Sequence, residues 1–416
     1  MLPEFYLSCL ESQLTESLVL TIKILVCLLQ FHKTVQLERL AAYLPLPILF
    51  ESRRRHLQRF LILPQISVAL IWLPLIKCIL RTQIKPKTQI IVAIDRTKWR
   101  ANNLLMVSVI WEKRAWPVYW QFLPKKGSSN LAQQKAILHP ALRLLKHYQI
   151  VVVADTEFHS IELANWLGQR KAYFALRQKQ GRRSLKTNQD ILEQHKLFVM
   201  QNRPLIKDVL ICPKILQGTY IKQKSQDYQR LSEIGLAPGI KLFFTGITFT
   251  KRKGFGEFNL AAYWQRSSKK KADEGWYILT NLNSLDIALK AYKARSGIEA
   301  LFKDCKSGGY NLENCKASEE RLTRIVLLIA LAYTCAGLQG QKIKRLGQQK
   351  YVNRLQELRR IDRRHSNFWI GLYGKMWIAA IDLCGDWLKK LMTIRRNKLP
   401  YFLKGLRAMS LIQQAF

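Results

Sequence analysis

The stretch LDIALKAYKARSGIEALFKDCKSGG, residues 285–309, carries a polar stripe around which the rest of the chain can be interpreted. At about 100° per residue in a helix, Tyr292, Arg295, Glu299 and Lys306 fall within about 60° of one another. A glutamate and two cations on one narrow face can border a cleft. The alternative is a surface helix with one glutamate among basic residues.

The other side of this helix is apolar, and a glycine pair marks its end. An apolar face beside a polar stripe is typical of a helix that packs on a sheet and leaves one edge free. Gly308-Gly309 predicts the C-terminal end of the helix. The apolar positions are Ile287, Ile298, Leu301, Phe302 and Cys305.

The spacing of the four polar residues is itself informative. Tyr292, Arg295, Glu299 and Lys306 form the pattern Y-x2-R-x3-E-x6-K. This pattern resembles the signature of the DDE transposases of bacterial insertion sequences, in the family numbered four, and the resemblance covers most of the chain. It implies that the glutamate acts together with two aspartates on upstream strands.

The segment 85–180 predicts the elements that would carry those aspartates. The runs KPKTQIIVAIDRTKW, LLMVSVIWEK and AWPVYWQFLP predict three strands, separated by turns at Asn102-Asn103 and Glu112-Lys113. A helix over 130–146 and the buried strand in YQIVVVADTEFHS follow. A further helix and a strand over 173–178 complete the segment.

The order of three strands, helix, strand, helix and strand is that of the ribonuclease-H-like fold. Asp95 is expected to end the first strand and Asp155 the fourth. These strands are neighbours in that fold, so the two carboxylates should meet at one edge of the sheet. IIVAIDRTKW and VVVADTEFHS resemble the aspartate motifs of the same transposases, although an aspartate at a strand end is more often a turn or cap residue. We predict an α/β fold with a ribonuclease-H-like catalytic core over 85–180 and 276–340.

The segment 181–275 separates the second aspartate from the glutamate. Short runs such as IKLFFTGITFT and GEFNLAAYWQ predict an all-β insertion, which the resembling transposases also carry at this point. Its basic runs, RQKQGRRSLK and KKKADE, fit either phosphate contacts or solvated loops.

Helical segments are predicted at both ends of the chain. Residues 1–84 would form an N-terminal DNA-binding region whose basic helix, around Arg53–Arg55, enters DNA as in a helix-turn-helix; the alternative is a helical cap with solvated arginines. Residues 341–416 predict a C-terminal helical basic segment for DNA or partner contact. The apolar runs 61–80 and 320–339 approach membrane length, but we expect core helices, the second packed on the sheet.

Composition indicates a polyanionic partner. The chain has 416 residues and a formal net charge of +40, and basic side chains bind phosphates by releasing counterions. The basic residues are spread over the whole length, which favours nucleic acid over a membrane surface. Eight cysteines without C-x-x-C or zinc-ligand spacing favour a reducing cytosolic compartment.

The predicted chemistry rests on three acids. Asp95, Asp155 and Glu299 would supply hard oxygen ligands for Mg²⁺ or Mn²⁺. Two such ions can clamp the attacking and leaving oxygens of a phosphodiester displacement. Without a cation, three converging carboxylates would repel one another and DNA, so we assign them to metal binding.

The resemblance also implies roles for four DNA-binding residues. Arg295 and Lys306 would contact phosphates near the scissile bond, with Tyr292 beside them. Trp276, in GWYILT, resembles a tryptophan on which some relatives stack a flipped base. A strand aromatic that fills a core is the alternative for Trp276.

Two functions follow as hypotheses. The first is a transposase that cuts the ends of its element and joins them to target DNA, as a homodimer on paired ends, in the cytoplasm on the nucleoid and without a membrane. The second is a catalytically silent copy that binds element ends without cutting. One departure is Thr156, where many relatives carry an arginine after the second aspartate.

Overall fold

The structure is a computed structural model that divides into two compact units. One unit, residues 83–300, holds the sheet; the other, residues 1–82 together with 301–416, is helical. The fold is therefore mixed α/β, as predicted. The structure describes residues 2–124, 127–179, 220–222, 229–231, 234, 236–249, 255–265, 275–355 and 365–416.

The sheet unit starts with an antiparallel meander of β1 (Gln89–Trp99), β2 (Asn102–Trp111) and β3 (Arg114–Phe122). Glu112 and Lys113 join β2 to β3 with φ values of 48° and 67°, the left-handed values that a tight hairpin turn needs. The other turn lies at Arg100, where φ is 50°, and not at Asn102-Asn103. Both asparagines instead pair with β1.

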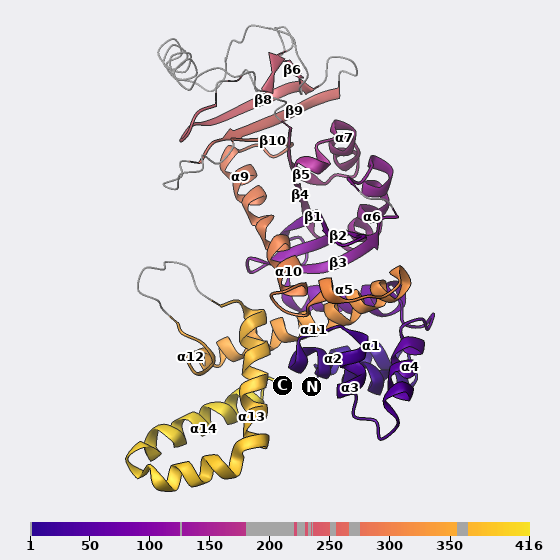
Figure 1. The fold of residues 1–416 in the computed structure, drawn as a ribbon. Coiled ribbons are helices and arrows are strands. Elements are labelled where there is room, and N and C mark those ends of the chain that lie inside the picture. Colours follow the sequence, from indigo (N-terminus) through magenta and orange to yellow (C-terminus); the bar gives the residue numbers. More distant parts are fainter. Residues whose placement is uncertain are drawn as a thin grey trace. The chain divides into compact units, whose positions relative to one another are not determined.

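The predicted order of the next elements is confirmed: α6 (Leu131–Leu144), β4 (Gln149–Ala154), α7 (Ile161–Gln169) and β5 (Tyr173–Arg177). A capping box starts α6, in which the Asn130 side chain accepts from the Gln133 N–H. β4 lies parallel to both β1 and β5, between them. β1 and β4 are therefore neighbours in the sheet (Figure 1).

The strands after β5 extend the same sheet. β10 (Trp276–Thr280), β9 (Phe255–Tyr263) and β8 (Lys241–Phe249) follow β5 in antiparallel order, then β6 (Tyr220–Lys222) and β7 (Gln229–Arg230). An all-β insertion was predicted over 181–275, and the strands described in this segment join the edge of the core sheet because β10 pairs with both β5 and β9. The basic run KKKADE and most of RQKQGRRSLK lie outside the described residues.

The predicted motif helix is two helices, α9 (Leu285–Ala294) and α10 (Ser296–Cys305). α9 packs on the sheet, against β4, β5 and β9 among its strands. Of the apolar positions that were expected to face a sheet, Ile287 is the one on α9, and it is exposed. The other four, Ile298, Leu301, Phe302 and Cys305, are buried but belong to α10. The break falls at Arg295, whose N–H donates to the Tyr292 carbonyl at 3.0 Å in a tighter turn. Gly297 then lets α10 start close to the β2–β3 hairpin, since a Cβ there would lie 3.1 Å from Ile110 Cδ1.

The N-terminal part of the helical unit contains α1 (Glu4–Glu11), α2 (Glu16–His32), α3 (Leu37–Tyr43), α4 (Phe50–Phe60) and α5 (Leu73–Gln83). A π-helical turn, Val68–Trp72, precedes α5, so the apolar run 61–80 is helical only from residue 68. The Tyr6 hydroxyl lies 2.7 Å from Thr334 Oγ1 in a fully buried contact that ties α1 to the C-terminal half of the chain.

The C-terminal part contains α11 (Glu319–Arg345), α12 (Gln349–Val352), α13 (Asn367–Ile394) and α14 (Leu399–Gln413). α11 was predicted to pack on the sheet, but it belongs to the helical unit, where it packs against α2 and α13. Its apolar side chains need partners on all sides, and helices from both chain ends supply them. The N- and C-terminal segments, predicted to be separate, therefore share one core.

Two elements of the described chain meet length and composition criteria for a membrane span. α11 does so alone, but 83% of its most apolar window is buried inside the protein, as in the core helix of a folded unit. α2 and α3 do so only when taken together, across a bend of 105°.

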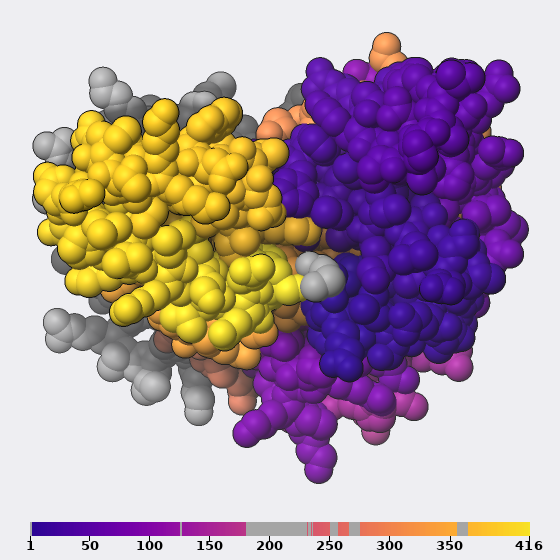
Figure 2. All heavy atoms as spheres, turned by 90° about the horizontal axis from the view of Figure 1, so that it is seen from below, coloured from indigo at the N-terminus to yellow at the C-terminus, as the bar shows by residue number. Residues whose placement is uncertain are grey.

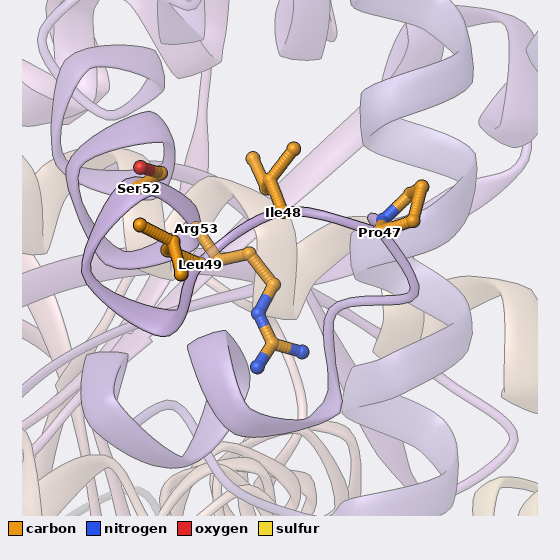
Figure 3. A pocket seen from close by; sticks show the side chains of 5 residues that line it. All are labelled: Pro47, Ile48, Leu49, Ser52 and Arg53. Atoms are coloured by element: carbon orange, nitrogen blue, oxygen red, sulfur yellow. The ribbon is translucent and has the colours of Figure 1, made fainter.

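The predicted DNA-binding helix is α4, and its arginines differ in their surroundings. Arg53 points from α4 toward the end of α3 and donates to the carbonyls of Ala42 and Leu44, so it holds the loop between the two helices (Figure 3). Among the described residues, Arg55 forms its ion pair with Glu51 of the same helix, and it is mostly exposed. The same loop, with Arg53, lines an open hollow, and none of the predicted site residues lines it.

Candidate active site

The two predicted aspartates stand on neighbouring parallel strands. Parallel pairing between β1 and β4 ends at Ile94 and Ala154, and each aspartate is the next residue. We predicted that Asp95 ends β1, but the strand continues to Trp99, paired with β2. Each carboxylate accepts a hydrogen bond of 2.7 Å from the N–H of the residue that follows it. These bonds orient both side chains at one place on the sheet.

Arg295 brings the third predicted acid to the aspartates. Its guanidinium lies 3.0 Å from Asp95 Oδ2 and 3.8 Å from Asp155 Oδ2, and it donates a short hydrogen bond to Glu299 one helical turn later. Its own position, at the break between α9 and α10, allows contact with both strands and α10. All three acids therefore surround one cation.

Burial controls the electrostatics of this cluster. Burial raises the pKa of Asp95 to about 6, against the opposing effect of Arg295. Burial also raises the pKa of Tyr292. It lowers the pKa of Arg295, but Tyr292 and the carboxylates more than offset this, so the guanidinium pKa is raised overall. Burial thus disfavours the charged form of Asp95, and a cation beside it opposes that effect.

The part of the chain that the structure describes contains no preformed group of metal-ligating side chains. Within those residues, no three His, Cys, Asp or Glu side chains are grouped closely enough to hold one ion. Asp95, Asp155 and Glu299 are instead spaced around the Arg295 guanidinium. Their role as metal ligands stays a prediction.

Two aromatic residues predicted to bind DNA lie together beside Asp155. The Tyr292 hydroxyl is 3.5 Å from Asp155 Oδ1. The ring of Trp276 meets that of Tyr292 edge-on, with centroids 5.1 Å apart, and meets Tyr263 similarly on its other side. Trp276 is therefore a partly buried strand aromatic next to the acidic cluster, and its role in stacking a base stays a prediction.

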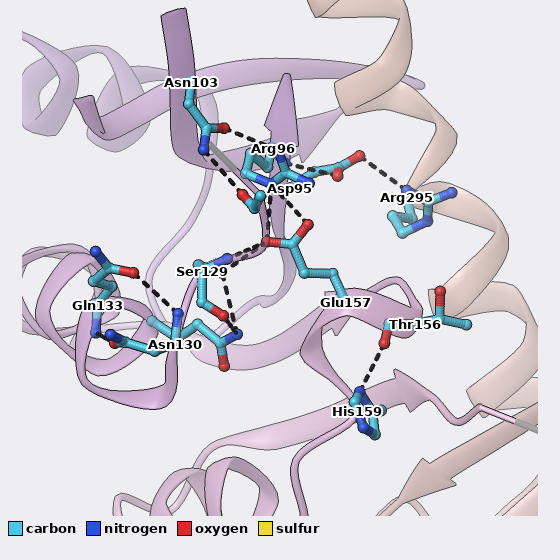
Figure 4. A network of polar contacts seen from close by, with 12 residues as sticks. Asp95, Arg96, Asn103, Ser129, Asn130, Gln133, Thr156, Glu157, His159 and Arg295 are labelled. Atoms are coloured by element: carbon cyan, nitrogen blue, oxygen red, sulfur yellow. Dashed lines mark hydrogen bonds and ion pairs between the residues drawn. The ribbon is translucent and has the colours of Figure 1, made fainter. Parts of the chain in front are cut away.

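An ion pair beside the aspartates ties their strands together (Figure 4). Arg96 follows Asp95, and its Nε lies 2.8 Å from Glu157 Oε2, two residues after Asp155. Glu157 Oε1 also accepts from the N–H and hydroxyl of Ser129, just before α6. The pair is largely buried, so it fixes the two strand ends and α6 in one arrangement.

The sequence analysis missed this pair and also Arg177. Arg96 and Glu157 stand inside the two aspartate motifs. Because the two strands were predicted to be neighbours, the opposite charges of these residues could have indicated an ion pair between them. Arg177, at the end of β5, lies 3.7 Å from Asp155 Oδ1. Its signal was weaker, being only its place at the end of a predicted strand. Arg177 approaches the aspartate that is followed by Thr156 in place of an arginine.

Lys306 lies just after α10, in the helical unit. Its N–H donates to the carbonyls of Phe302 and Lys303, and its own carbonyl accepts from Asn311 at 2.8 Å. Partial burial lowers the pKa of Lys306, against the effect of Glu313. The predicted place of Lys306 beside Glu299 stays a prediction.

Comparisons with known proteins identify the family. Among solved structures, the chain is similar to one described as a cryo-EM structure of the piggyBac transposase synaptic complex with hairpin DNA, at 13% identity and a TM-score of 0.44, over 90% of this chain and 75% of that one. No curated protein matches the chain. A family model described as the transposase DDE domain matches residues 86–335, which include both aspartates and Glu299. Since that match spans more than half of the chain, this protein belongs to the transposase DDE domain family.

Proposed function

We propose that this protein is the DNA transposase of an insertion sequence, which cuts the ends of its element and joins them to target DNA by metal-dependent hydrolysis and strand transfer. The observation that carries the proposal is that Asp95, Asp155 and Glu299 all contact one guanidinium. Three carboxylates that surround the Arg295 guanidinium can bind other cations in its place. Membership of the transposase DDE domain family supports the reaction class.

The catalytic core in this proposal is ribonuclease-H-like. The strand order β3-β2-β1-β4-β5, with β1, β4 and β5 parallel, supports it. So do α6 and α7, which connect the parallel strands. In such a core the acids belong where β1 and β4 leave their parallel pairing, as Asp95 and Asp155 do.

Asp95, Asp155 and Glu299 would hold the metal, which we propose to be two Mg²⁺ or Mn²⁺ ions. The donor set fits, because all three are carboxylates and hard divalent cations prefer oxygen ligands. When bound, such ions polarise the phosphodiester and activate the attacking oxygen. Arg295 fills the space between the acids, so it must turn away for the ligands to close around an ion.

The remaining residues of the site would bind DNA. Arg295, once released, together with Arg177 and Lys306, would hold phosphates near the scissile bond. Tyr292 and Trp276 would form the aromatic wall beside the acids. End recognition would depend on α4, where Arg55 is exposed, and on the basic C-terminal segment, since phosphate contacts position a protein and groove contacts specify sequence.

Double-stranded DNA is the proposed partner, both as element ends and as target. The net charge of +40 supports it. We further propose that two copies act on paired ends, in the cytoplasm and on the nucleoid.

The direct test is incubation of the protein with end-containing DNA and Mg²⁺. Strand cleavage is expected from the natural sequence and should be lost in Asp95→Asn, Asp155→Asn and Glu299→Gln proteins that still bind the DNA. The alternative, a silent copy that occupies ends, is favoured by the full pairing of Arg295 with all three acids. Binding without nicking by the unaltered protein would establish the silent copy.

A further inference from the structure

The C-terminal half of α13 carries a row of apolar side chains that the described chain leaves uncovered. The buried residues of this helix, among them Phe368 and Gly374, come from its first turns. The last turns, in contrast, expose large apolar side chains. The exposed fractions are 82% for Leu383, 74% for Trp387, 42% for Leu391 and 71% for Ile394.

These four residues form one stripe, which we name the α13 stripe. Their spacing of four, four and three residues places them within about 80° of one another around the helix. Such a narrow apolar stripe is the pattern by which one helix packs along another. Scattered apolar residues on a surface need no explanation, but a continuous row on one face marks an interaction surface.

The neighbouring helix α14 does not cover the stripe. The end of α14 packs on the other part of α13: Ile412 and Ala415 share a core cluster with Ile370, joined by Trp377 and Ile378. These contacts fix the hairpin of α13 and α14, whose C-terminal residues are seen at the surface in Figure 2. The stripe is thus held on a stable scaffold and left open.

The charges beside the stripe point to a second copy of this chain as its partner. Asp382 and Asp386 lie before Trp387, and Lys389 and Lys390 lie after it. Within the described residues, the ion pair of Asp386 is with Lys389 of its own helix, and both side chains are largely exposed. A helix that is acidic at one end of a stripe and basic at the other complements itself when two copies run antiparallel.

We infer that two copies of this protein associate through an antiparallel seam of their α13 stripes. A two-fold axis between residues 388 and 389 puts Leu383 opposite Ile394 and Trp387 beside Leu391. Asp386 of one copy then meets Lys390 of the other on the same flank. A parallel pair would instead place like charges at the same height, which is destabilising.

The size of the stripe indicates a reversible dimer. Each copy contributes four apolar side chains, fewer than the 20 to 30 residues a side of a standard interface of about 1,600 Å². The association should therefore depend on concentration. It stands independently of DNA cleavage, and it would supply the two copies that the proposed function needs.

Sedimentation velocity on the full chain without DNA tests the seam over a range of concentrations. We expect a monomer–dimer equilibrium for the natural sequence and monomers for Leu383→Glu and Trp387→Glu. Leu49→Glu is the matched control, because Leu49 is 80% exposed but lies away from α13, and it should dimerise normally. Circular dichroism should show unaltered helix content in all three variants, since the changed side chains are exposed.

Charge exchange tests the antiparallel direction. Asp386→Lys and Lys390→Asp should each weaken self-association at least threefold, because every cross-pair becomes a like-charge pair. An equimolar mixture of the two variants, or both changes in one chain, should restore it. Single variants that dimerise like the natural sequence would overturn the direction.

A natural protein that stays monomeric at all concentrations, or a Trp387→Glu variant that still dimerises, would overturn the seam itself. So would monomers that sediment with anionic phospholipid vesicles and lose that binding in Trp387→Glu, because the stripe would then face a membrane. None of these results depends on whether the protein cuts DNA.

Discussion

Arg295 sits where a divalent cation would be held, so the protein carries its own counter-ion for the acidic cluster. We expect Arg295→Ala to lower the unfolding free energy in metal-free buffer by about 1–3 kcal/mol, because the largely buried Asp95 loses this ion-pair partner. Glu299 adds little to this value, since it is half-exposed. The same change should tighten Mn²⁺ binding, by about tenfold if releasing the guanidinium costs about 1.4 kcal/mol.

Thermal denaturation with a chelator and Mn²⁺ titration by calorimetry measure these two effects. Lys293→Ala is the control, because Lys293 is exposed at the end of α9 and its ammonium lies over the ring of Tyr263, not in the acidic cluster. Unchanged Mn²⁺ affinity in Arg295→Ala would mean that the guanidinium does not compete with the ion.

Asp95 gives the site a defined pH dependence. Burial raises the pKa of Asp95 to about 6 from 3.8, so in the window between these values the folded protein keeps a proton that the unfolded chain releases. Its contribution to the unfolding free energy therefore falls as pH rises through this window, and the loss is complete above it. Asp95→Asn should remove this slope.

Denaturant unfolding in metal-free buffer between about pH 4 and pH 6.5 tests the slope. Asp286→Asn serves as the control, since Asp286 is a largely exposed carboxylate on α9 and should leave the slope intact. A slope that survives in Asp95→Asn must come from other groups.

At the residue scale, the sequence predicted the groups whose spacing repeats a signature and missed those that only three-dimensional proximity connects. Asp95, Asp155, Glu299 and Arg295 come together because strand order and helix period bring them together. Arg177 reaches Asp155 only because β5 lies beside β4, and no local pattern reveals that.

In the described helical unit, glycines allow α11 and α13 to come close together where the two helices cross. A Cβ on Gly340 would lie 1.9 Å from the Asn367 carbonyl oxygen, and a Cβ on Gly371 would lie 1.9 Å from that of Ala336. Both obstacles are backbone, which cannot rotate aside. Each glycine is therefore needed for the two helices to touch.

Gly340→Ala and Gly371→Ala should each lower the unfolding free energy by about 1–3 kcal/mol, because the helices must separate. Gly337→Ala should be neutral or slightly stabilising, since alanine favours the helix. Gly337 lies one turn before Gly340 on α11, and a Cβ there would have nothing within 4 Å. Guanidinium denaturation measures all three. Equal effects at positions 337 and 340 would contradict a close crossing.

At the element scale, apolar and β-branched runs predicted the strands and the order through β5. The break of the motif helix at Arg295 had no such signal, because the 3.6-residue period continues across it. Likewise, the strands after β5 were recognised, but their joining the core sheet depends on long-range pairing of β10 with β5 and β9. Periodicity cannot show which strand pairs with which.

The helical unit is assembled from both ends of the chain, and this decides how the N-terminal region can be studied. Leu25, Leu29 and Leu57 line one small apolar cavity together with Ile325 and Leu328 of α11. Removing residues 1–82 should therefore expose α11 and give an aggregated protein, and not a folded one without end recognition. Size-exclusion chromatography and near-ultraviolet circular dichroism would show this.

Arg55→Ala is the comparison that keeps the fold, because its side chain is mostly exposed and its ion pair is with Glu51 of the same helix. Loss of preference for element ends in this variant would assign α4 to recognition. A soluble, cooperatively folding protein lacking residues 1–82 would contradict the shared core. Sequence patterns predicted helices at both ends of the chain. They did not predict that these helices share one core, since a hydrophobic pattern does not show which other segment will cover it.

The division of the chain also determines the order in which the parts of the two units become available for folding during synthesis. Residues 83–300 lie between the two parts of the helical unit, so the first helices emerge from the ribosome long before α11 and α13 exist. At about 5–20 residues per second this wait lasts roughly 10–45 s. Leu25, Leu29 and their neighbours lack their native partners on α11 for that time, while the sheet unit can already be complete. A ribosome that stalls within the last hundred residues would therefore leave a finished sheet unit attached to unburied apolar helices, which are ready substrates for chaperones and proteases.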